Sequence, residues 1–286
     1  MFEQVVFAGG GNRCWWQAGW WDVVAPAIDL KPRVIGGVSA GAATACMLYA
    51  NDSRWTMDYY REALRHNRRN AYWGNLFRRA RDPQQPQAAR VFPHAAIYRR
   101  ALHDILGGER FAKLKADAPE IRIQYARLPR GLGPYAAVAV GLVAYNVEKY
   151  WKKSLHPTFG RRIGFAPEVA LLSDCSDIDD LVSLIIASSC TPPFTPIEHR
   201  GGRPTLDGGM VDNVPVDAVQ QGPSTLVLLT RRYPGRADTF THQGRVYVQP
   251  SKKVSIGAWD YTDPPAMQVT YDQGRSDGER FVAALR

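Results

Sequence analysis

The sequence is poor in cysteine. Its 286 residues include only four, which are widely spaced and form no CxxC pair: Cys14, Cys46, Cys175 and Cys190. Disulfide frameworks and structural zinc sites need several thiols at short, regular spacings, so the sequence predicts neither. We expect reduced and mostly buried thiols.

Long apolar runs are also missing. The longest nearly uncharged apolar stretch covers residues 135–145, which is shorter than the roughly 20 residues that span a bilayer as a helix. The opening residues, 1–8, lack a basic segment followed by an apolar one, so no secretory signal is expected. These absences predict a cytoplasmic protein whose contact with a membrane is at most peripheral.

Acidic residues are outnumbered by basic ones. The chain has 27 Asp and Glu against 36 Lys and Arg, and a formal net charge of +9. This excess predicts an anionic partner, which could be a phospholipid headgroup layer, an acidic substrate or nucleic acid. No nucleic-acid-binding motif is present, so nucleic acid is not expected. The rival to an enzyme is a basic module that binds nucleic acid or a membrane and carries only a vestigial catalytic site.

Strand-like and helix-like segments alternate along the first 50 residues. This alternation predicts an α/β fold with a mostly parallel central sheet flanked by helices. Without repeats or a low-complexity tail, residues 1–286 are expected to form a single domain. Arginine and aromatic residues crowd the segment 54–90, and we expect a helical cap or insert over residues 54–130. Further elements are predicted as helices at 92–106, at 180–189 and near the C-terminus, and as strands at 121–126, 169–172, 226–229 and 246–248.

A GxSxG element lies between an apolar strand and a helix. Gly37 and Gly41 bracket Ser39 there. A serine on a sharp strand-to-helix turn is held in a strained conformation, and larger flanking side chains would collide with neighbouring elements. The element therefore predicts a nucleophile elbow with Ser39 as nucleophile, although a small-residue turn without function gives the same pattern.

A glycine triplet follows the first predicted strand. Gly9, Gly10 and Gly11 leave backbone N–H groups uncovered ahead of a helix, and Arg13 adds positive charge, so an oxyanion could bind there. A purely structural turn is one alternative. The other is a dinucleotide-binding GxGxxG turn, in which Cys14 occupies the third glycine position and no suitably placed acidic residue follows.

A third motif contains the candidate base. Asp207, Gly208 and Gly209 follow a predicted strand, where a simple hairpin turn is the alternative interpretation. None of the six histidines lies in a distinctive glycine-flanked loop, so a carboxylate is the better candidate to activate the serine. A hidden triad containing His199 or His242 stays open.

These three motifs, in this order, resemble the patatin-like phospholipase family. The family pattern is GGGx[RK]G, then GxSxG, then DG[GA], and here Cys14 replaces the last glycine of the first motif. Residues 187–196 and 212–216 resemble the flanks of the family's third motif. The resemblance covers residues 5–51 and 169–229, and the segment between them carries no family signature.

The resemblance implies a patatin-like three-layer α/β/α fold and a serine acyl hydrolase that needs no metal or organic cofactor. Ser39 and Asp207 are the implied dyad, with an acyl-lipid or other acyl ester as substrate. An acyltransferase or thioesterase that uses the same dyad is the alternative. The arginine- and aromatic-rich stretch 54–81 could contact an anionic membrane or be a solvated helix face. Four tryptophans at helical spacing are expected to pack on the sheet, with one or two in an acyl pocket: Trp15, Trp16, Trp20 and Trp21.

Overall fold

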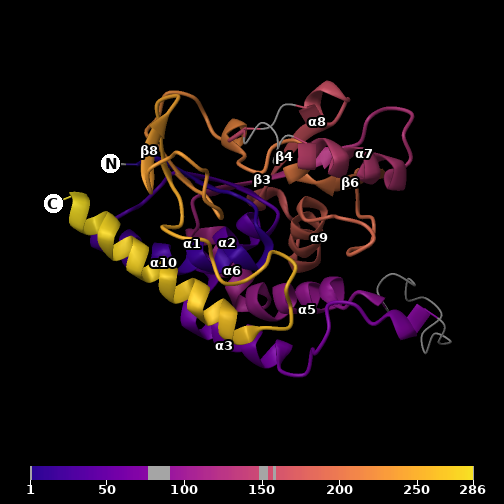
Figure 1. Ribbon diagram of the computed structural model, residues 1–286, viewed down its shortest axis with the longest axis horizontal. Helices are drawn as coiled ribbons and strands as arrows, with labels where there is room; N and C mark the ends of the chain where they lie inside the picture. Colours follow the sequence, from indigo (N-terminus) through magenta and orange to yellow (C-terminus); the bar gives the residue numbers. More distant parts are fainter. Residues whose placement is uncertain (1, 77–90, 148–153, 157–158, 286) are drawn as a thin grey trace.

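The computed structural model describes residues 2–76, 91–147, 154–156 and 159–285, and its centre is a nine-stranded sheet (Figure 1). Five neighbouring strands are parallel, in the order β3-β2-β1-β7-β9. Strands β4 and β6 pair antiparallel with β3, β8 pairs antiparallel with β9, and β5 pairs with β6. The strands are β1 (Gln4–Phe7), β2 (Val34–Val38), β3 (Glu120–Arg127), β4 (Ala166–Leu171), β5 (His199–Arg200), β6 (Arg203–Asp207), β7 (Thr225–Leu228), β8 (Thr239–His242) and β9 (Arg245–Val248).

Nine α-helices in the described residues flank this sheet, which confirms the predicted α/β fold with a mostly parallel sheet. The helices are α1 (Trp15–Ala27), α2 (Ala40–Ala50), α3 (Ser53–Leu64), α5 (His94–Leu106), α6 (Glu109–Asp117), α7 (Pro134–Val147), α8 (Phe159–Arg162), α9 (Ile178–Ser188) and α10 (Pro264–Leu285). The predicted helices at 92–106 and 180–189 and the strands at 121–126, 226–229 and 246–248 occur within two residues of their expected bounds. No helix of the described segments is long and apolar enough to cross a membrane.

The central parallel strands β1, β2 and β7 are buried on both faces, which explains their mostly apolar sequences. Because side chains alternate along β1, Val5 and Phe7 join the large core beneath the helices, whereas Val6 and Ala8 join a second cluster on the opposite face. Short segments containing Val214, Val216 and Val219 cover that second face.

Helices α1 and α10 cross at very close range. A β-carbon on Gly19 would lie 2.0 Å from the carbonyl oxygen of Tyr271, and one on Gly274 would lie 2.1 Å from that of Trp16. The Trp16 indole N–H donates to Asp277 at 2.7 Å, which ties the helices together. All four tryptophans are buried in the core. Trp21 contacts Phe7 of β1 as predicted, whereas Trp15 and Trp20 contact rings on α3 and α10.

The predicted insert over residues 54–130 needs a correction at its C-terminal end. Strand β3 lies inside the central sheet between β2 and the antiparallel strands, so it is not part of a helical cap. The buried faces of α3, α5 and α6 also belong to the main core, through side chains such as Leu64, Leu102 and Leu114. Part of the arginine-rich stretch, residues 77–90, lies outside the described residues.

Candidate active site

The chain turns sharply between β2 and α2, and Ser39 is the turning residue. Its φ of 54° and ψ of −135° lie in a region that non-glycine residues rarely adopt, so the turn is strained. Both predicted glycines are required by space. A β-carbon on Gly37 would lie 2.7 Å from the Cα of Ala42, and one on Gly41 would lie 2.5 Å from the carbonyl oxygen of Ala8.

A serine that sequence reasoning missed supports this turn. Ser188, the last residue of α9, accepts a hydrogen bond from the Ser39 N–H at 2.7 Å. The Ser188 hydroxyl donates in turn to the carbonyl oxygen of Gln124 on β3 at 2.6 Å. The strained turn is therefore fixed to the sheet by a buried side chain from a distant helix.

Sheet register brings Asp207 to Ser39. Val38 pairs with Gln124, and the next residue of β3, Tyr125, pairs with Asp207 at the end of β6. The Ser39 hydroxyl donates a hydrogen bond to the Asp207 carboxylate, with an Oγ–Oδ2 distance of 2.8 Å. The two residues predicted as a dyad thus meet directly, although 168 positions separate them in the sequence.

Burial controls the charge state of Asp207. Removal from water raises the pKa of its carboxyl to about 6, while hydrogen bonds with Gly209, Ser39 and Thr191 act in the opposite direction. The Gly209 N–H donates to Oδ1 at 2.7 Å, which leaves Oδ2 for the serine. Asp207 is therefore largely ionised at neutral pH but is a stronger base than an exposed aspartate.

The glycine triplet divides into two roles. The N–H of Gly9 donates to the carbonyl oxygen of Asn213 at 2.9 Å and so holds the loop in place. Gly9 is therefore not available as one of the predicted oxyanion donors. Within the described chain the N–H groups of Gly10 and Gly11 have no acceptor, and both residues line the cavity around Ser39. Arg13 lines the same cavity, with its Nε donating to the Gly10 carbonyl at 3.1 Å.

A cavity of about 170 Å³ opens over Ser39 and Asp207. Its wall includes His94, which sequence reasoning did not single out. Burial lowers the pKa of this imidazole, and its Nε2 lies 3.0 Å from the Trp259 carbonyl oxygen. Neither of the two histidines considered for a hidden triad is among the lining residues described. His199 lies on β5, and His242 lies on β8.

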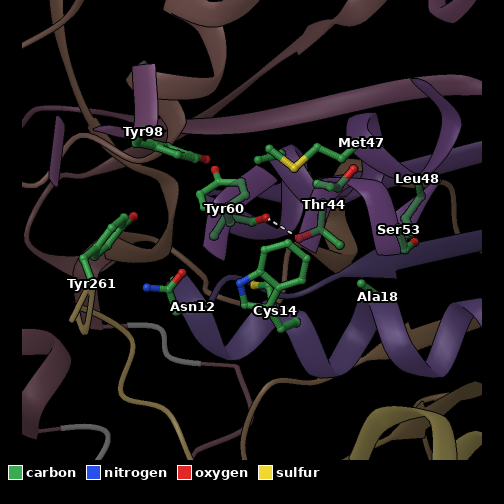
Figure 2. Close-up of a pocket in the computed structure, with 15 residues that line it drawn as sticks. Asn12, Cys14, Ala18, Thr44, Met47, Leu48, Ser53, Tyr60, Tyr98 and Tyr261 are labelled. Atoms are coloured by element: carbon green, nitrogen blue, oxygen red, sulfur yellow. Dashed lines mark hydrogen bonds between the residues drawn. The ribbon is translucent and has the colours of Figure 1, made fainter. Parts of the chain in front are cut away.

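Figure 2 shows a second cavity, of about 50 Å³. Four residues line both cavities: Gly11, Ala40, Tyr98 and Tyr261. The wall of the second is mostly apolar and includes Trp15, Met47, Leu48 and Tyr60. Cys14, at the position where the family pattern has glycine, also lines it; burial raises the pKa of this thiol to about 12, so it stays protonated.

All four cysteines are free and buried, as predicted. Within the residues that the structure describes, no group of three or more His, Cys, Asp or Glu side chains is arranged to hold a metal ion.

The chain is similar in sequence to one protein family. A sequence model described as "Patatin-like phospholipase" matches residues 5–219, which is more than half of the chain. Among solved structures, VipD from Legionella pneumophila is similar with a TM-score of 0.46 and 9% identity, over 99% of this chain and 67% of that one. A likeness at this level carries no argument about activity. No curated protein sequence matches the chain.

Proposed function

Because the chain belongs to the patatin-like phospholipase family, a family of carboxylic-ester hydrolases, we propose that Ser39 and Asp207 act as its catalytic dyad on acyl lipids. The family implies lipid acyl hydrolase activity. The observation that supports the dyad most strongly is the 2.8 Å hydrogen bond from the serine hydroxyl to a buried carboxylate. That serine also has the strained backbone of a nucleophile elbow.

In the proposed first step, Asp207 accepts the Ser39 hydroxyl proton while the serine oxygen attacks the acyl carbonyl carbon. Negative charge then develops on the carbonyl oxygen. The unpaired N–H groups of Gly10 and Gly11 are the proposed donors to this oxygen, and one such donor typically contributes about 3 kcal/mol. Arg13 contributes positive charge at the same cavity.

The tetrahedral intermediate collapses when the ester C–O bond breaks, and Asp207 returns its proton to the departing alcohol. A water molecule then attacks the acyl-serine, with Asp207 again accepting the proton. The second attack releases a fatty acid and restores Ser39. A carboxyl group whose pKa is about 6 suits both transfers near neutral pH.

The second cavity is the proposed binding site of the acyl chain. It adjoins the Ser39 cavity through residues common to both walls, and its lining is predominantly apolar (Figure 2). Burial of each methylene contributes about 0.8 kcal/mol, so a cavity of this kind favours aliphatic acyl groups over polar ones.

The dyad is tested by hydrolysis of p-nitrophenyl esters. Ser39→Ala and Asp207→Asn should each lower kcat/KM by at least about a thousandfold. The matched controls are Ser276→Ala and Asp272→Asn, which change exposed residues of α10 and should retain wild-type activity. Near-normal turnover in either dyad variant refutes the proposal. Product analysis with an added alcohol or an acyl thioester distinguishes hydrolysis from acyl transfer and thioesterase activity.

A further inference from the structure

Helix α7 is apolar all round, yet one of its faces is exposed. Its 14 residues, PYAAVAVGLVAYNV, include no charged side chain. Ala137 and Val138 are buried, whereas Tyr135, Val140 and Val143 are 71%, 40% and 64% exposed. A helix that is hydrophobic on every side is normally buried, so the exposed face of α7 indicates an apolar partner.

The buried face of α7 rests against the proposed catalytic loop. A β-carbon on Gly141 would lie 3.0 Å from the sulfur of Met210 and 3.1 Å from the ring of Phe165. Met210 follows Asp207 by three residues and lines the Ser39 cavity. Figure 1 shows α7 next to α8 and β6, and its contacts with β6 and with the Gly208–Met210 turn place the helix beside the loop that carries Asp207.

Positive charge gathers where α7 begins. The loop before the helix touches the segment after α8, since a β-carbon on Gly164 would lie 3.2 Å from the Cβ of Pro129. Next to this contact, Arg130 and Arg162 are exposed and have no ion-pair partner in the described chain. Apart from Arg130, residues 128–147 contain no charged side chain.

We propose that α7 docks this protein on an anionic phospholipid surface. Its exposed face, formed by Tyr135, Val140 and Val143, enters the boundary between headgroups and acyl chains, and Arg130 and Arg162 contact lipid phosphates. A membrane-surface helix combines these features: apolar and aromatic side chains on one side and flanking basic residues. The arginines favour a lipid surface over an uncharged apolar protein partner, since phosphate complements their charge.

The proposal concerns binding and does not depend on the dyad. Binding is therefore measured with protein carrying Ser39→Ala, so that vesicle lipids are not consumed whatever the activity. The assay is sedimentation with phosphatidylcholine vesicles, with or without about one-quarter phosphatidylserine. Binding should be stronger with phosphatidylserine and should weaken as salt is raised, because salt screens exposed charges.

Two sets of variants test the surface. Val140→Asp/Val143→Asp should weaken binding by at least about tenfold, because two apolar side chains that enter the lipid become charged. The matched control is Val269→Asp on α10, where the valine is 52% exposed. Arg130→Gln/Arg162→Gln should weaken binding about 25-fold, because each charge near an anionic surface strengthens binding about fivefold. Its control, Arg54→Gln/Arg69→Gln, removes two exposed arginines of the stretch 54–81.

Circular dichroism spectra and thermal unfolding show whether each variant is folded, and the arginine pair remains informative if the aspartate pair does not fold. The proposal is overturned if wild-type protein binds neither kind of vesicle, or if both α7 variants bind like their controls. Loss of binding only in the Arg54→Gln/Arg69→Gln variant assigns the membrane surface to residues 54–81. If the wild-type protein does not bind vesicles but self-associates, and Val140→Asp/Val143→Asp abolishes that self-association, the exposed face of α7 contacts a second copy of the chain.

Discussion

Replacing Asp207 with asparagine should abolish ester hydrolysis and, at neutral pH, stabilise the folded protein. The carboxyl group is buried, and burial is the largest cause of its raised pKa, about 6. Asparagine has nearly the same shape and removes the charge. Its Oδ1 can accept the N–H of Gly209, and its Nδ2 can donate to the Ser39 oxygen, so the hydrogen bonds with Gly209 and Ser39 have replacements.

The expected magnitude follows from the pKa difference between the folded and unfolded chains. The unfolded carboxyl ionises near pH 3.9, and the folded one near pH 6. Below about pH 3.9 the group is protonated in both states and its contribution to stability is fully present. As the pH rises from about 3.9 to 6, the unfolded chain releases the proton before the folded chain does. The contribution of this carboxyl group to stability is therefore lost over that range. Two pH units correspond to about 3 kcal/mol, all of which is lost above pH 6.

Urea unfolding of both proteins at several values between pH 4 and pH 8 measures this effect. Other carboxylates act equally in both proteins, so the difference in unfolding free energy isolates Asp207. The advantage of the variant should grow by about 2 kcal/mol from pH 4 to pH 6 and become constant above about pH 7. In parallel, wild-type kcat/KM should fall about tenfold per pH unit below pH 6. A pH-independent difference, or a flat activity profile down to pH 4.5, would refute the reasoning.

Three further changes test the fold and the site. Gly274→Ala should cost about 1–3 kcal/mol, measured by urea unfolding, because its β-carbon meets the Trp16 carbonyl; an unchanged free energy contradicts the close crossing. Ser188→Ala removes the acceptor of the Ser39 N–H and should lower kcat by roughly tenfold or more with little change in KM, and unchanged kinetics argue against its positioning role. Met47→Trp should fill part of the second cavity and move the preferred p-nitrophenyl ester to shorter chains, by about fourfold in kcat/KM per methylene excluded; an unchanged preference means that the acyl chain binds elsewhere.

The sharp turn at Ser39 could be predicted from sequence because its constraints are local. Gly37 and Gly41 are needed within two residues of Ser39, and the steric reasons for them act within a single turn. The order of three such turns along one chain then identifies the family. Ser188 carries no local signal, since it is one of two adjacent serines at a helix end. Its role depends on where α9 crosses β3, which only the three-dimensional arrangement gives.

The prediction of a cap over residues 54–130 relied on composition alone. Residues 54–130 are rich in arginine at the start, and composition alone does not distinguish an external layer from helices with one buried face. Helix α3 has buried Met57, Tyr60 and Leu64 on one side and its charged residues on the other. Five of its 12 residues are buried, so the helix belongs to the core although the charged residues of its exposed face dominate the composition.

The wall of the proposed active site is completed by a segment outside the family match. Residues 258–261 follow the matched region, 5–219, yet Ala258, Trp259 and Tyr261 line the Ser39 cavity. The same segment holds the glycine loop, since the Asn12 N–H donates to the Ala258 carbonyl oxygen at 3.0 Å. Helix α10 follows it directly and packs on α1, the helix that begins after the glycine loop. The family region therefore contains the proposed reacting groups, while the shape of the cavity also depends on residues that the family motifs do not include.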